Sequence, residues 1–335
     1  MHPRARVPAH AEHAPARKQS TKALSLVGAA AAVALIAVTL PMFGSPKADG
    51  AQSFEAAPAS VTPSLSTRAG VGAPPATQAT KATSRPKPKT LKAAAGADGW
   101  NLVWADEFDS DSIDRSKWNL RDGEGRDVDR GCNVSSPENT FVRDGVLTLR
   151  ALRKTVACGK QTRRFTQSYL DTIGRHSWTY GRFEMRAKSP NRAGRSTGLW
   201  PAFWLRPEDG GNGEIDVAEL PGGDKWHARS TAAVFYDYSP VKQDTRIELP
   251  GGGHPGDGFH TYATEWTADS LTWFIDGHPV WKRDRGTTPF FDEVFHKPYD
   301  IRLNFQVGGW LGEPDDATVF PADFVVDYVR VYQRD

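Results

Sequence analysis

Residues 214–220, Glu-Ile-Asp-Val-Ala-Glu-Leu, place three carboxylates inside an otherwise apolar, strand-like run. Successive side chains of a strand point to opposite faces, so Glu214 and Asp216 share one face and Glu219 points to the other. A β-bulge at residues 217–218 would add one residue and return Glu219 to the first face. A strand with such a bulge would carry all three carboxylates on one face.

Three carboxylates on one face would destabilise a purely structural sheet, because like charges repel and buried charges lose solvation. A glycosidase uses this arrangement: one ionised carboxylate acts as nucleophile and one protonated carboxyl acts as acid, about 5–5.5 Å apart in a retaining enzyme. Like-charge coupling inside a cleft helps to keep the second proton bound. The motif therefore indicates glycoside hydrolysis, and a solvated acidic strand is the alternative.

Charge is unevenly distributed along the 335 residues. The first 97 residues carry 12 Lys+Arg and 3 Asp+Glu, a net charge of +9, whereas the rest carry 30 and 37, a net charge of −7, for a total of +2. The weak basicity belongs to the N-terminal part, so it gives no argument for nucleic-acid binding. All eleven Trp lie between Trp100 and Trp310, which favours one folded domain with a large core.

The N-terminal part begins with a basic leader, residues 1–22, which is expected to stay cytoplasmic. Residues 23–46 contain no charged side chain. This run is longer than the usual signal-peptide core of about 7–15 residues and close to the roughly 20 residues of a spanning helix. It predicts a signal-peptide core or a transmembrane anchor. Either one places the C-terminal domain outside the cell, secreted or tethered to the outer face of the membrane.

Residues 47–97 are rich in Ala, Pro, Ser and Thr. Such a segment cannot bury enough apolar surface to fold, so we expect a disordered linker. The catalytic domain is then expected over residues 98–335.

The chain contains two cysteines, Cys132 and Cys158. In an exported domain an isolated pair of this kind predicts one disulfide, and two unrelated buried thiols are the alternative.

Short β-rich runs separated by turns dominate the chain after residue 98. Residues 181–188, 199–205 and 324–332 are examples, and Asp276-Gly277 marks a tight turn between two further strands. Many antiparallel strands over about 235 residues favour an all-β, two-sheet sandwich. Curved sheets of this kind can carry a long open cleft on their concave face.

Seven matches to one family, with the carboxylate motif among them, follow in order along the chain: Trp104-Ala-Asp-Glu-Phe108, Tyr180-Gly-Arg-Phe-Glu-Met-Arg-Ala-Lys188, Gly198-Leu-Trp-Pro-Ala-Phe-Trp-Leu205, Gly213-Glu-Ile-Asp-Val-Ala-Glu219, Phe259-His260 with Glu265-Trp266, Val307-Gly-Gly-Trp310 and Asp327-Tyr-Val-Arg-Val-Tyr332. Together they resemble glycoside hydrolase family 16. The resemblance implies an antiparallel β-jelly-roll sandwich with a concave substrate cleft, and retaining hydrolysis of β-linked polysaccharides. The two residues between Asp216 and Glu219 are similar to the bulged, laminarinase-type branch.

On this resemblance, Glu214 is expected to be the nucleophile, and Glu219 the general acid and then the general base. Asp216 is expected between them, tuning their ionisation. The expected substrate is β-1,3-glucan or mixed β-1,3/1,4-glucan, cleaved internally through a covalent glycosyl-enzyme intermediate.

Tryptophan side chains are candidates for sugar binding, because the apolar CH face of a glucose ring packs well on an aromatic plane. Trp200 and Trp204 precede the carboxylate strand, and Trp310 follows two glycines in a loop. These three are expected in the cleft, with a core position as the alternative, and Asn133 matches a sugar-binding asparagine of the family. The other aromatic and histidine candidates are expected to be structural: Trp104, Trp118, Trp266, Trp273 and His260.

A calcium ion is often bound on the convex face in this family. The matching ligand positions here are Glu107, Gly145 and Asp327. Oxygen ligands from distant segments would join the first and last strands. An acidic pair with purely structural hydrogen bonds is the alternative. No cofactor is expected for catalysis.

Two stretches depart from the family pattern. Residues 169–174 lack an expected arginine, and residues 229–236 replace an expected His-Gly-Thr-x-His-Tyr-like run. Both regions shape sugar subsites, so the exact polysaccharide stays open. A β-galactan hydrolase of the agarase or carrageenase type, or a transglycosylase, is the alternative among enzymes. A non-catalytic glucan-binding module is the alternative from another class. We expect a monomer that binds polysaccharide and no nucleic acid.

Overall fold

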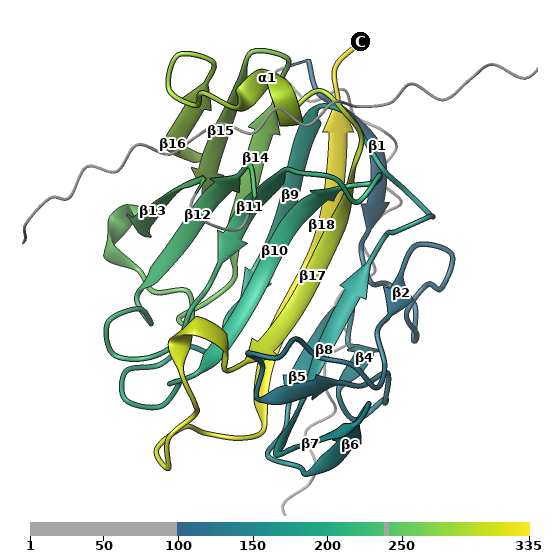
Figure 1. Cartoon of the computed structure of the whole chain (residues 1–335), viewed down its shortest axis with the longest axis vertical. Coiled ribbons are helices and arrows are strands. Elements are labelled where there is room, and N and C mark those ends of the chain that lie inside the picture. The colour runs from purple at the N-terminus through teal and green to yellow at the C-terminus, as the bar shows by residue number, and fades with distance from the viewer. Residues whose placement is uncertain (1–98, 238–240) are drawn as a thin grey trace, which may run out of the picture. The chain divides into compact units, whose positions relative to one another are not determined.

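The computed structural model describes residues 99–237 and 241–335, and the segments predicted as leader, signal or anchor, and linker lie outside the described residues. Two antiparallel sheets make up almost all of the described part (Figure 1). This confirms the predicted all-β sandwich. Among the described residues, no helix is long and apolar enough to span a membrane.

The first sheet, here called the outer sheet, has the strand order β16-β15-β14-β9-β18-β5-β4, and β1 pairs with β18. Its strands are β1 (Asn101–Asp106), β4 (Thr140–Arg143), β5 (Val146–Ala151), β9 (Gly181–Lys188), β14 (His260–Trp266), β15 (Ser270–Ile275), β16 (His278–Asp284) and β18 (Ala322–Gln333).

The second sheet, here called the cleft sheet, has the order β13-β12-β11-β10-β17-β8-β2, and β3 pairs with β8. Its strands are β2 (Asn119–Leu120), β3 (Gly131–Asn133), β8 (Phe165–Asp171), β10 (Leu199–Pro207), β11 (Glu214–Glu219), β12 (Arg229–Phe235), β13 (Lys242–Glu248) and β17 (Tyr299–Val307). The smaller elements are β6 (Val156–Cys158), β7 (Gln161–Arg163), η1 (Pro250–Gly252), α1 (Phe291–Val294) and η2 (Gly309–Leu311).

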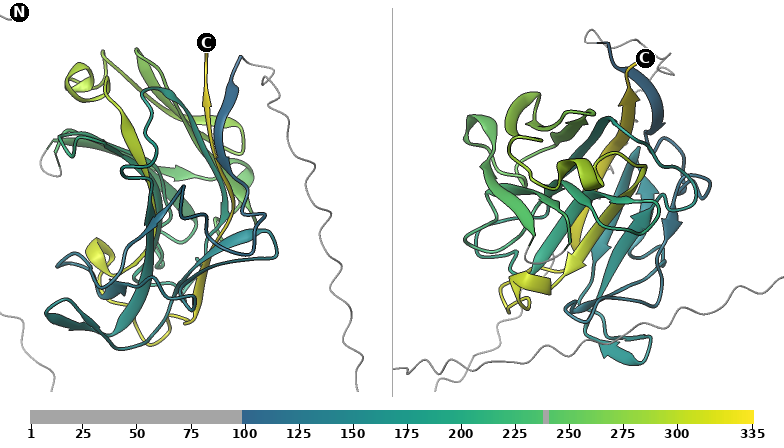
Figure 2. Two further views of the ribbon diagram at one scale, coloured as in Figure 1. Left: turned by 90° about the vertical axis from the view of Figure 1, so that its right-hand side faces the viewer. Right: turned by 45° about the horizontal axis from the view of Figure 1, so that its top comes forward.

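Strict alternation of buried and partly exposed residues is clear in β9 of the outer sheet. Residues 181–188 alternate between buried and partly exposed positions along β9, so Phe183 and Met185 point into the core between the sheets. The cleft sheet faces this core with one side and leaves its other, concave side for the cleft. The curvature of both sheets is visible in Figure 2.

Three of the four tryptophans expected in the core are fully buried, namely Trp118, Trp266 and Trp273. Trp104 is partly buried and packs edge-to-face on Trp118, with ring centroids 5.5 Å apart. The core prediction is therefore confirmed for the first three, while Trp104 covers the edge of the core.

The turn at Asp276-Gly277 joins β15 to β16, as predicted. Both residues have positive φ, 49° and 76°, as a type I′ hairpin turn requires. His260 at the start of β14 lies with its Nδ1 atom 2.7 Å from Asp276 Oδ2. This contact ties the turn to the neighbouring strand and agrees with a structural histidine.

The predicted disulfide between Cys132 and Cys158 is present. It joins β3, which runs parallel to β8, to the small β6–β7 hairpin. Asn133, the next residue after Cys132, lines the main cavity of the domain. The disulfide therefore fixes a segment that borders this cavity.

Replacing both cysteines by serine should lower the melting temperature of the domain. The disulfide joins residues 26 positions apart, and closing a loop of that length stabilises the folded state by roughly 3 kcal/mol. In a domain of this size, that free energy corresponds to a change in melting temperature of about 6–12 °C. Thermal unfolding followed by circular dichroism measures the change. An unchanged melting temperature would show that other contacts hold the hairpin in place.

Candidate active site

The three carboxylates of β11 share one face because the strand contains a bulge. Against β12, Asp216 lies opposite Ala233 and Glu219 lies opposite Thr231, so three steps along β11 match two along β12. The same shift appears against β10. This confirms the predicted bulge. The extra residue turns Glu219 back toward the side that carries Glu214 and Asp216.

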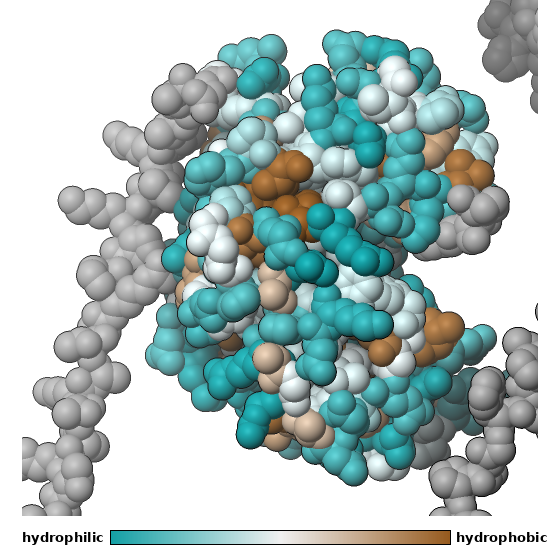
Figure 3. Space-filling view, turned by 90° about the vertical axis from the view of Figure 1, so that its left-hand side faces the viewer, coloured by the Kyte–Doolittle hydropathy of each residue, from teal (hydrophilic) through white to brown (hydrophobic). Residues whose placement is uncertain are grey.

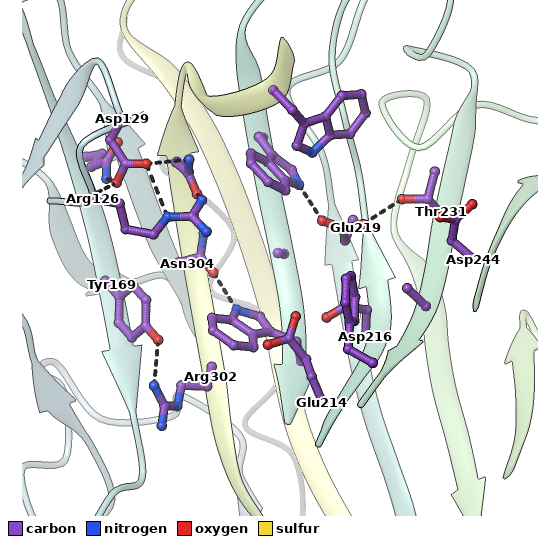
Figure 4. A pocket seen from close by; sticks show the side chains of 18 of the residues that line it. Arg126, Asp129, Tyr169, Glu214, Asp216, Glu219, Thr231, Asp244, Arg302 and Asn304 are labelled. Atoms are coloured by element: carbon purple, nitrogen blue, oxygen red, sulfur yellow. Dashed lines mark hydrogen bonds and ion pairs between the residues drawn. The ribbon is translucent and has the colours of Figure 1, made fainter. Parts of the chain in front are cut away.

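A cleft of about 1070 Å³ lies over the concave side of the cleft sheet, and all three carboxylates line it (Figure 4). Figure 3, which views the molecule from the side of β13 and β16, shows the surface hollowed between two lobes. Aromatic and basic side chains line the cleft together with the carboxylates: Tyr169, Trp200, Trp204, Trp226, Phe235, Trp310, Arg121, Arg126, Lys242, Arg246 and Arg302.

Glu219 is held by one hydrogen bond on each carboxyl oxygen. Trp200 Nε1 donates to Oε1 at 2.8 Å, and Thr231 Oγ1 donates to Oε2 at 3.0 Å. Burial raises the pKa of Glu219 to about 7, and the charge of Glu214 adds to the rise, although the two hydrogen bonds oppose it. This carboxyl group can therefore hold a proton near neutral pH.

Asp216 lies between the two glutamates and is 5 % exposed. Burial raises the pKa of its carboxyl well above the ordinary value, and the neighbouring charges of Glu214 and Glu219 raise it further. A side-chain hydrogen bond links Asp216 to Glu214. Beneath the strand, Trp273 Nε1 donates to the Asp216 carbonyl oxygen at 2.8 Å, so the core holds the strand at this position.

Glu214 is 6 % exposed and has a cationic neighbour. Arg206 Nη1 donates to Glu214 Oε2 at 3.2 Å, and Arg206 Nη2 lies 3.4 Å from the Gly211 carbonyl oxygen. A guanidinium group stays charged at every accessible pH and favours an ionised carboxylate beside it. The site therefore has an arginine-paired carboxylate at one end of the motif and a proton-holding carboxyl at the other.

Trp200 and Trp204 both line the cleft, as predicted. Besides its bond to Glu219, Trp200 has the Arg126 guanidinium 5.4 Å from its ring centroid. Trp204 Nε1 donates to Asn304 Oδ1 at 2.6 Å, so its indole N–H is also used within the protein. The two tryptophans thus fix polar groups of the site as well as forming its wall.

Trp310 is the most exposed of the three predicted cleft tryptophans, with 51 % of its surface accessible. It lies in η2, directly after Gly308 and Gly309, whose φ angles of 92° and 72° favour glycine. Its ring contacts Trp200 and Trp226 edge-to-face, at centroid distances of 5.4 and 5.1 Å. An indole held in this way offers an open aromatic surface to the cleft.

Asn133 lines the same cleft from β3. Its Oδ1 atom accepts a hydrogen bond from Gln167 Nε2 at 3.0 Å, and the same nitrogen lies 3.2 Å from Asp129 Oδ2. Gln306 Nε2 donates to Asp129 Oδ1 at 2.6 Å. Asn133 is therefore one member of a buried polar network that closes one side of the cleft.

Several of these residues were missed by sequence reasoning, although a signal for them exists. Arg206 follows Trp204 by two positions on β10, and alternation therefore places both on the cleft face. Gln306 continues the polar series Asp300, Arg302 and Asn304 at alternate positions of β17, and Gln167 lies two positions before Tyr169 on β8, so alternation places each glutamine on the cleft face. Trp226 has no comparable signal, because it lies in the loop between β11 and β12.

The two stretches that depart from the family pattern both border the cleft. In the first, Tyr169 lies beside Arg302 of β17, whose Nη1 atom is 3.2 Å from the Tyr169 hydroxyl. In the second, Thr231 and Ala233 line the cleft, and the small Ala233 lies opposite Asp216. The cleft therefore has an arginine from a different strand on one side and an alanine next to the carboxylates.

The predicted calcium ligands have arginine partners. Both Glu107 oxygens accept from Arg330, at 2.7 and 2.8 Å, and Asp327 Oδ2 accepts from Arg186 at 2.6 Å. Within residues 99–237 and 241–335, no three His, Cys, Asp or Glu side chains gather as a metal site. Both carboxylates are thus engaged by arginine in this structure. Calcium at Glu107, Gly145 and Asp327 stays a prediction.

Comparison with known proteins agrees with this geometry. The model of the family "Glycosyl hydrolases family 16" matches residues 131–330. The chain belongs to glycosyl hydrolase family 16.

Family 16 relatives match most of the described residues. A beta-glucanase of Rhodothermus marinus is 35% identical over 258 residues, which cover 71% of this chain and 86% of that protein. The glucan endo-1,3-beta-glucosidase A1 of Niallia circulans is 30% identical over 269 residues, covering 70% of this chain and 38% of that protein. The solved catalytic domain of an endo-1,3-beta-glucanase (laminarinase) from Thermotoga petrophila has a TM-score of 0.63 at 30% identity, covering 70% of this chain and 98% of that one.

The raised pKa of Glu219 predicts how stability depends on pH in this family 16 domain. Between the ordinary glutamate pKa of 4.5 and about 7, the folded protein binds more protons than the unfolded chain, so this group destabilises the fold as pH rises. Glu219→Gln removes that effect. The melting temperature of the variant relative to the wild type should therefore increase from pH 5 to pH 8.

Differential scanning calorimetry of both proteins at a series of pH values provides the measurement. Glu138→Gln, which replaces an exposed carboxylate paired with Lys154, serves as the control. A difference between Glu219→Gln and wild type that stays constant from pH 5 to pH 8 would contradict a raised pKa.

Proposed function

We propose that this chain is an endo-acting, retaining glycosidase that cleaves β-1,3-glucan or mixed β-1,3/1,4-glucan. The observation that carries the proposal is the bulged β11 strand, which holds a proton-binding Glu219 and an arginine-paired Glu214 on one face of an open cleft. The relatives named as a beta-glucanase and as endo-1,3-beta-glucanases support the substrate class. An open cleft accepts a chain along its length, which supports internal cleavage.

In the proposed reaction, Glu214 attacks the anomeric carbon while Glu219 donates its proton to the departing glycosidic oxygen. The carbon–oxygen bond to the leaving sugar breaks, and an ester bond to Glu214 forms. Glu219, now ionised, takes a proton from a water molecule that attacks the same carbon and releases Glu214. Both steps use only carboxyl groups and water, so we propose that catalysis needs no cofactor.

Asp216 contributes through its position between the two glutamates. Its hydrogen bond to Glu214 and its proximity to Glu219 couple the ionisation of the three groups. Because coupled groups titrate together, the pH limits of the reaction belong to the cluster as a whole. A glucan-binding module without activity would have no use for this arrangement, which favours the hydrolase over the binding module.

Glu214→Gln tests the role of the nucleophile. The variant keeps the shape of the side chain and loses the attacking anion, so kcat should fall by several orders of magnitude while the affinity for laminari-oligosaccharides is retained. Reducing-sugar release from laminarin and from mixed-linkage glucan gives kcat. Isothermal titration gives the affinity, and turnover above about a tenth of the wild type would overturn the assignment.

Glu219→Ala separates the acid from the nucleophile. The variant should be nearly inactive on glucan and partly recover on an activated aryl glycoside when azide is added, because that leaving group needs no proton and azide replaces the activated water. The product should be a β-glycosyl azide, detectable by nuclear magnetic resonance. Azide rescue of Glu214→Ala in place of Glu219→Ala would show that the two roles are exchanged.

Arg206→Met tests the cationic neighbour of Glu214. Without the guanidinium, ionised Glu214 loses its nearest positive charge, so its carboxyl group binds a proton more readily. A higher pH is then needed to reach the ionised, active form. The acid limb of the kcat/KM profile should move to higher pH, and Arg206→Lys should move it less. Lys297→Met, which removes a surface cation paired with Asp209, is the control. Identical acid limbs in Arg206→Met and wild type would assign Arg206 a packing role alone.

The disulfide between Cys132 and Cys158 supports an oxidising location for this domain. We propose export of the domain, either secreted or held at the outer face of the membrane through residues 23–46. A monomeric state stays a prediction as well.

A further inference from the structure

A second groove of about 880 Å³ adjoins the main cleft. Trp226, Arg246 and Trp310 line both hollows, so the groove continues the cleft past these three side chains. The other charged residues of the groove are Asp224, Lys225, Arg229 and Glu248. The proposed reaction uses none of these side chains, so the function of the groove has to be inferred from its own residues.

Arg246 lies in register with the carboxylate that we propose as the acid. On adjacent strands, Glu219 of β11 pairs with Thr231 of β12, and Thr231 pairs with Arg246 of β13. Two strand spacings amount to roughly 10 Å. A polysaccharide that crosses the strands with its scissile bond at Glu219 would therefore bring a neighbouring sugar to Arg246.

Cationic side chains around the cleft almost all have acidic partners. The pairs are Arg121–Asp171, Arg126–Asp129, Arg206–Glu214, Arg229–Glu248, Lys242–Asp244 and Arg302–Asp300. Arg246 and Lys225 have no ion pair with any residue in the described part of the chain, and both line the second groove. The groove also holds two carboxylates: Glu248 is paired with Arg229, and Asp224 accepts a hydrogen bond from the Gly194 N–H. Arg246 and Lys225 together thus leave a small excess of positive charge at this end of the cleft.

Trp226 holds the Arg246 side chain in a defined position. The guanidinium carbon lies 4.4 Å from the ring centroid of Trp226, and Trp226 packs edge-to-face on Trp310. A guanidinium stacked on an aromatic face keeps the N–H groups at its edge available, and these groups match the oxygens of a carboxylate or sulfate. Because the arginine is partly ordered before binding, less entropy is lost when it pairs.

We propose that the second groove is a subsite for an anionic group on the polysaccharide, bound by Arg246, with Lys225 lining the same groove. The substrate class is then a β-glucan that carries carboxylate or sulfate groups on its sugars. The inference rests on the proposed function and deepens it, because it adds a charge preference to the same cleft. Trp226 and Trp310 would contact the sugar ring while Arg246 pairs with its charged substituent.

The test compares carboxymethylated β-1,3-glucan with hydroxyethylated β-1,3-glucan of the same degree of substitution, which is neutral. The ratio of kcat/KM on the charged polymer to kcat/KM on the neutral polymer should fall about five- to tenfold in Arg246→Gln, the size expected for one charge-assisted pair. Arg246→Lys, which keeps the charge and loses the planar group, should give an intermediate ratio. One molar salt should lower the ratio of the wild type.

Arg334→Gln is the matched control. Arg334 is also an exposed arginine stacked on a tryptophan, 4.2 Å from the Trp100 centroid, and it lies outside both hollows. Its ratio should equal that of the wild type. A ratio unchanged in Arg246→Gln, or an equal drop on both polymers, would overturn the anionic subsite. A sulfated β-1,3-glucan run beside the carboxymethylated one identifies which anion is preferred.

Binding measurements separate this proposal from the proposed function. If the wild-type protein is inactive on every β-glucan, the proposed hydrolase function is overturned. The subsite is then tested by titrating both polymers into Glu214→Gln. Tighter binding of the carboxymethylated polymer that is lost in Glu214→Gln/Arg246→Gln would support the subsite. Equal affinity for the two polymers would overturn it, whatever the activity of the wild type.

Discussion

The bulge in β11 is the constraint on which the site depends. It forces Glu214, Asp216 and Glu219 onto one face, where burial and mutual repulsion oppose full ionisation. Partners on neighbouring strands stabilise the charged forms of these carboxyl groups to different degrees. Arg206 supplies a directly bonded positive charge to one end, whereas the other end receives neutral hydrogen bonds from Thr231 and Trp200 and a weaker effect from the charge of Lys242. The asymmetry of these partners separates a charged carboxylate from a protonated one.

The surrounding sheet keeps this arrangement in place. Trp273 reaches across from the outer sheet to bond the Asp216 carbonyl oxygen, which ties the bulge to the core between the two sheets. On the other side of the cleft, Gln306 and Gln167 both bond to Asp129. These contacts join segments far apart in the sequence, so the rigidity of the cleft follows from the packing of the whole sandwich.

Sequence alone was sufficient for features that depend on local patterns. The hairpin turn follows from Asp276-Gly277. The bulge does not follow from alternation, which would turn Glu219 away from Glu214, and it was expected from the resemblance to family 16. Contacts that depend on strand register could not be predicted in the same way. The pairing of β10 with β11 decides that Arg206 meets Glu214, and one residue of slippage would place it on the other face.

Composition was also a poor guide to the charge of the cleft. The described domain is acidic as a whole, and a negative net charge gives no indication of a preference for anionic polysaccharides. However, most acidic side chains near the cleft are already paired with arginine or lysine, so the net charge of the chain says little about the field inside it. A substrate meets only the charge that is left after these ion pairs have formed. In the second groove, Arg246 and Lys225 have no ion pair and outnumber the one carboxylate, Asp224, that also has none among the described residues. The significance of the two cations emerges only once their neighbours are known.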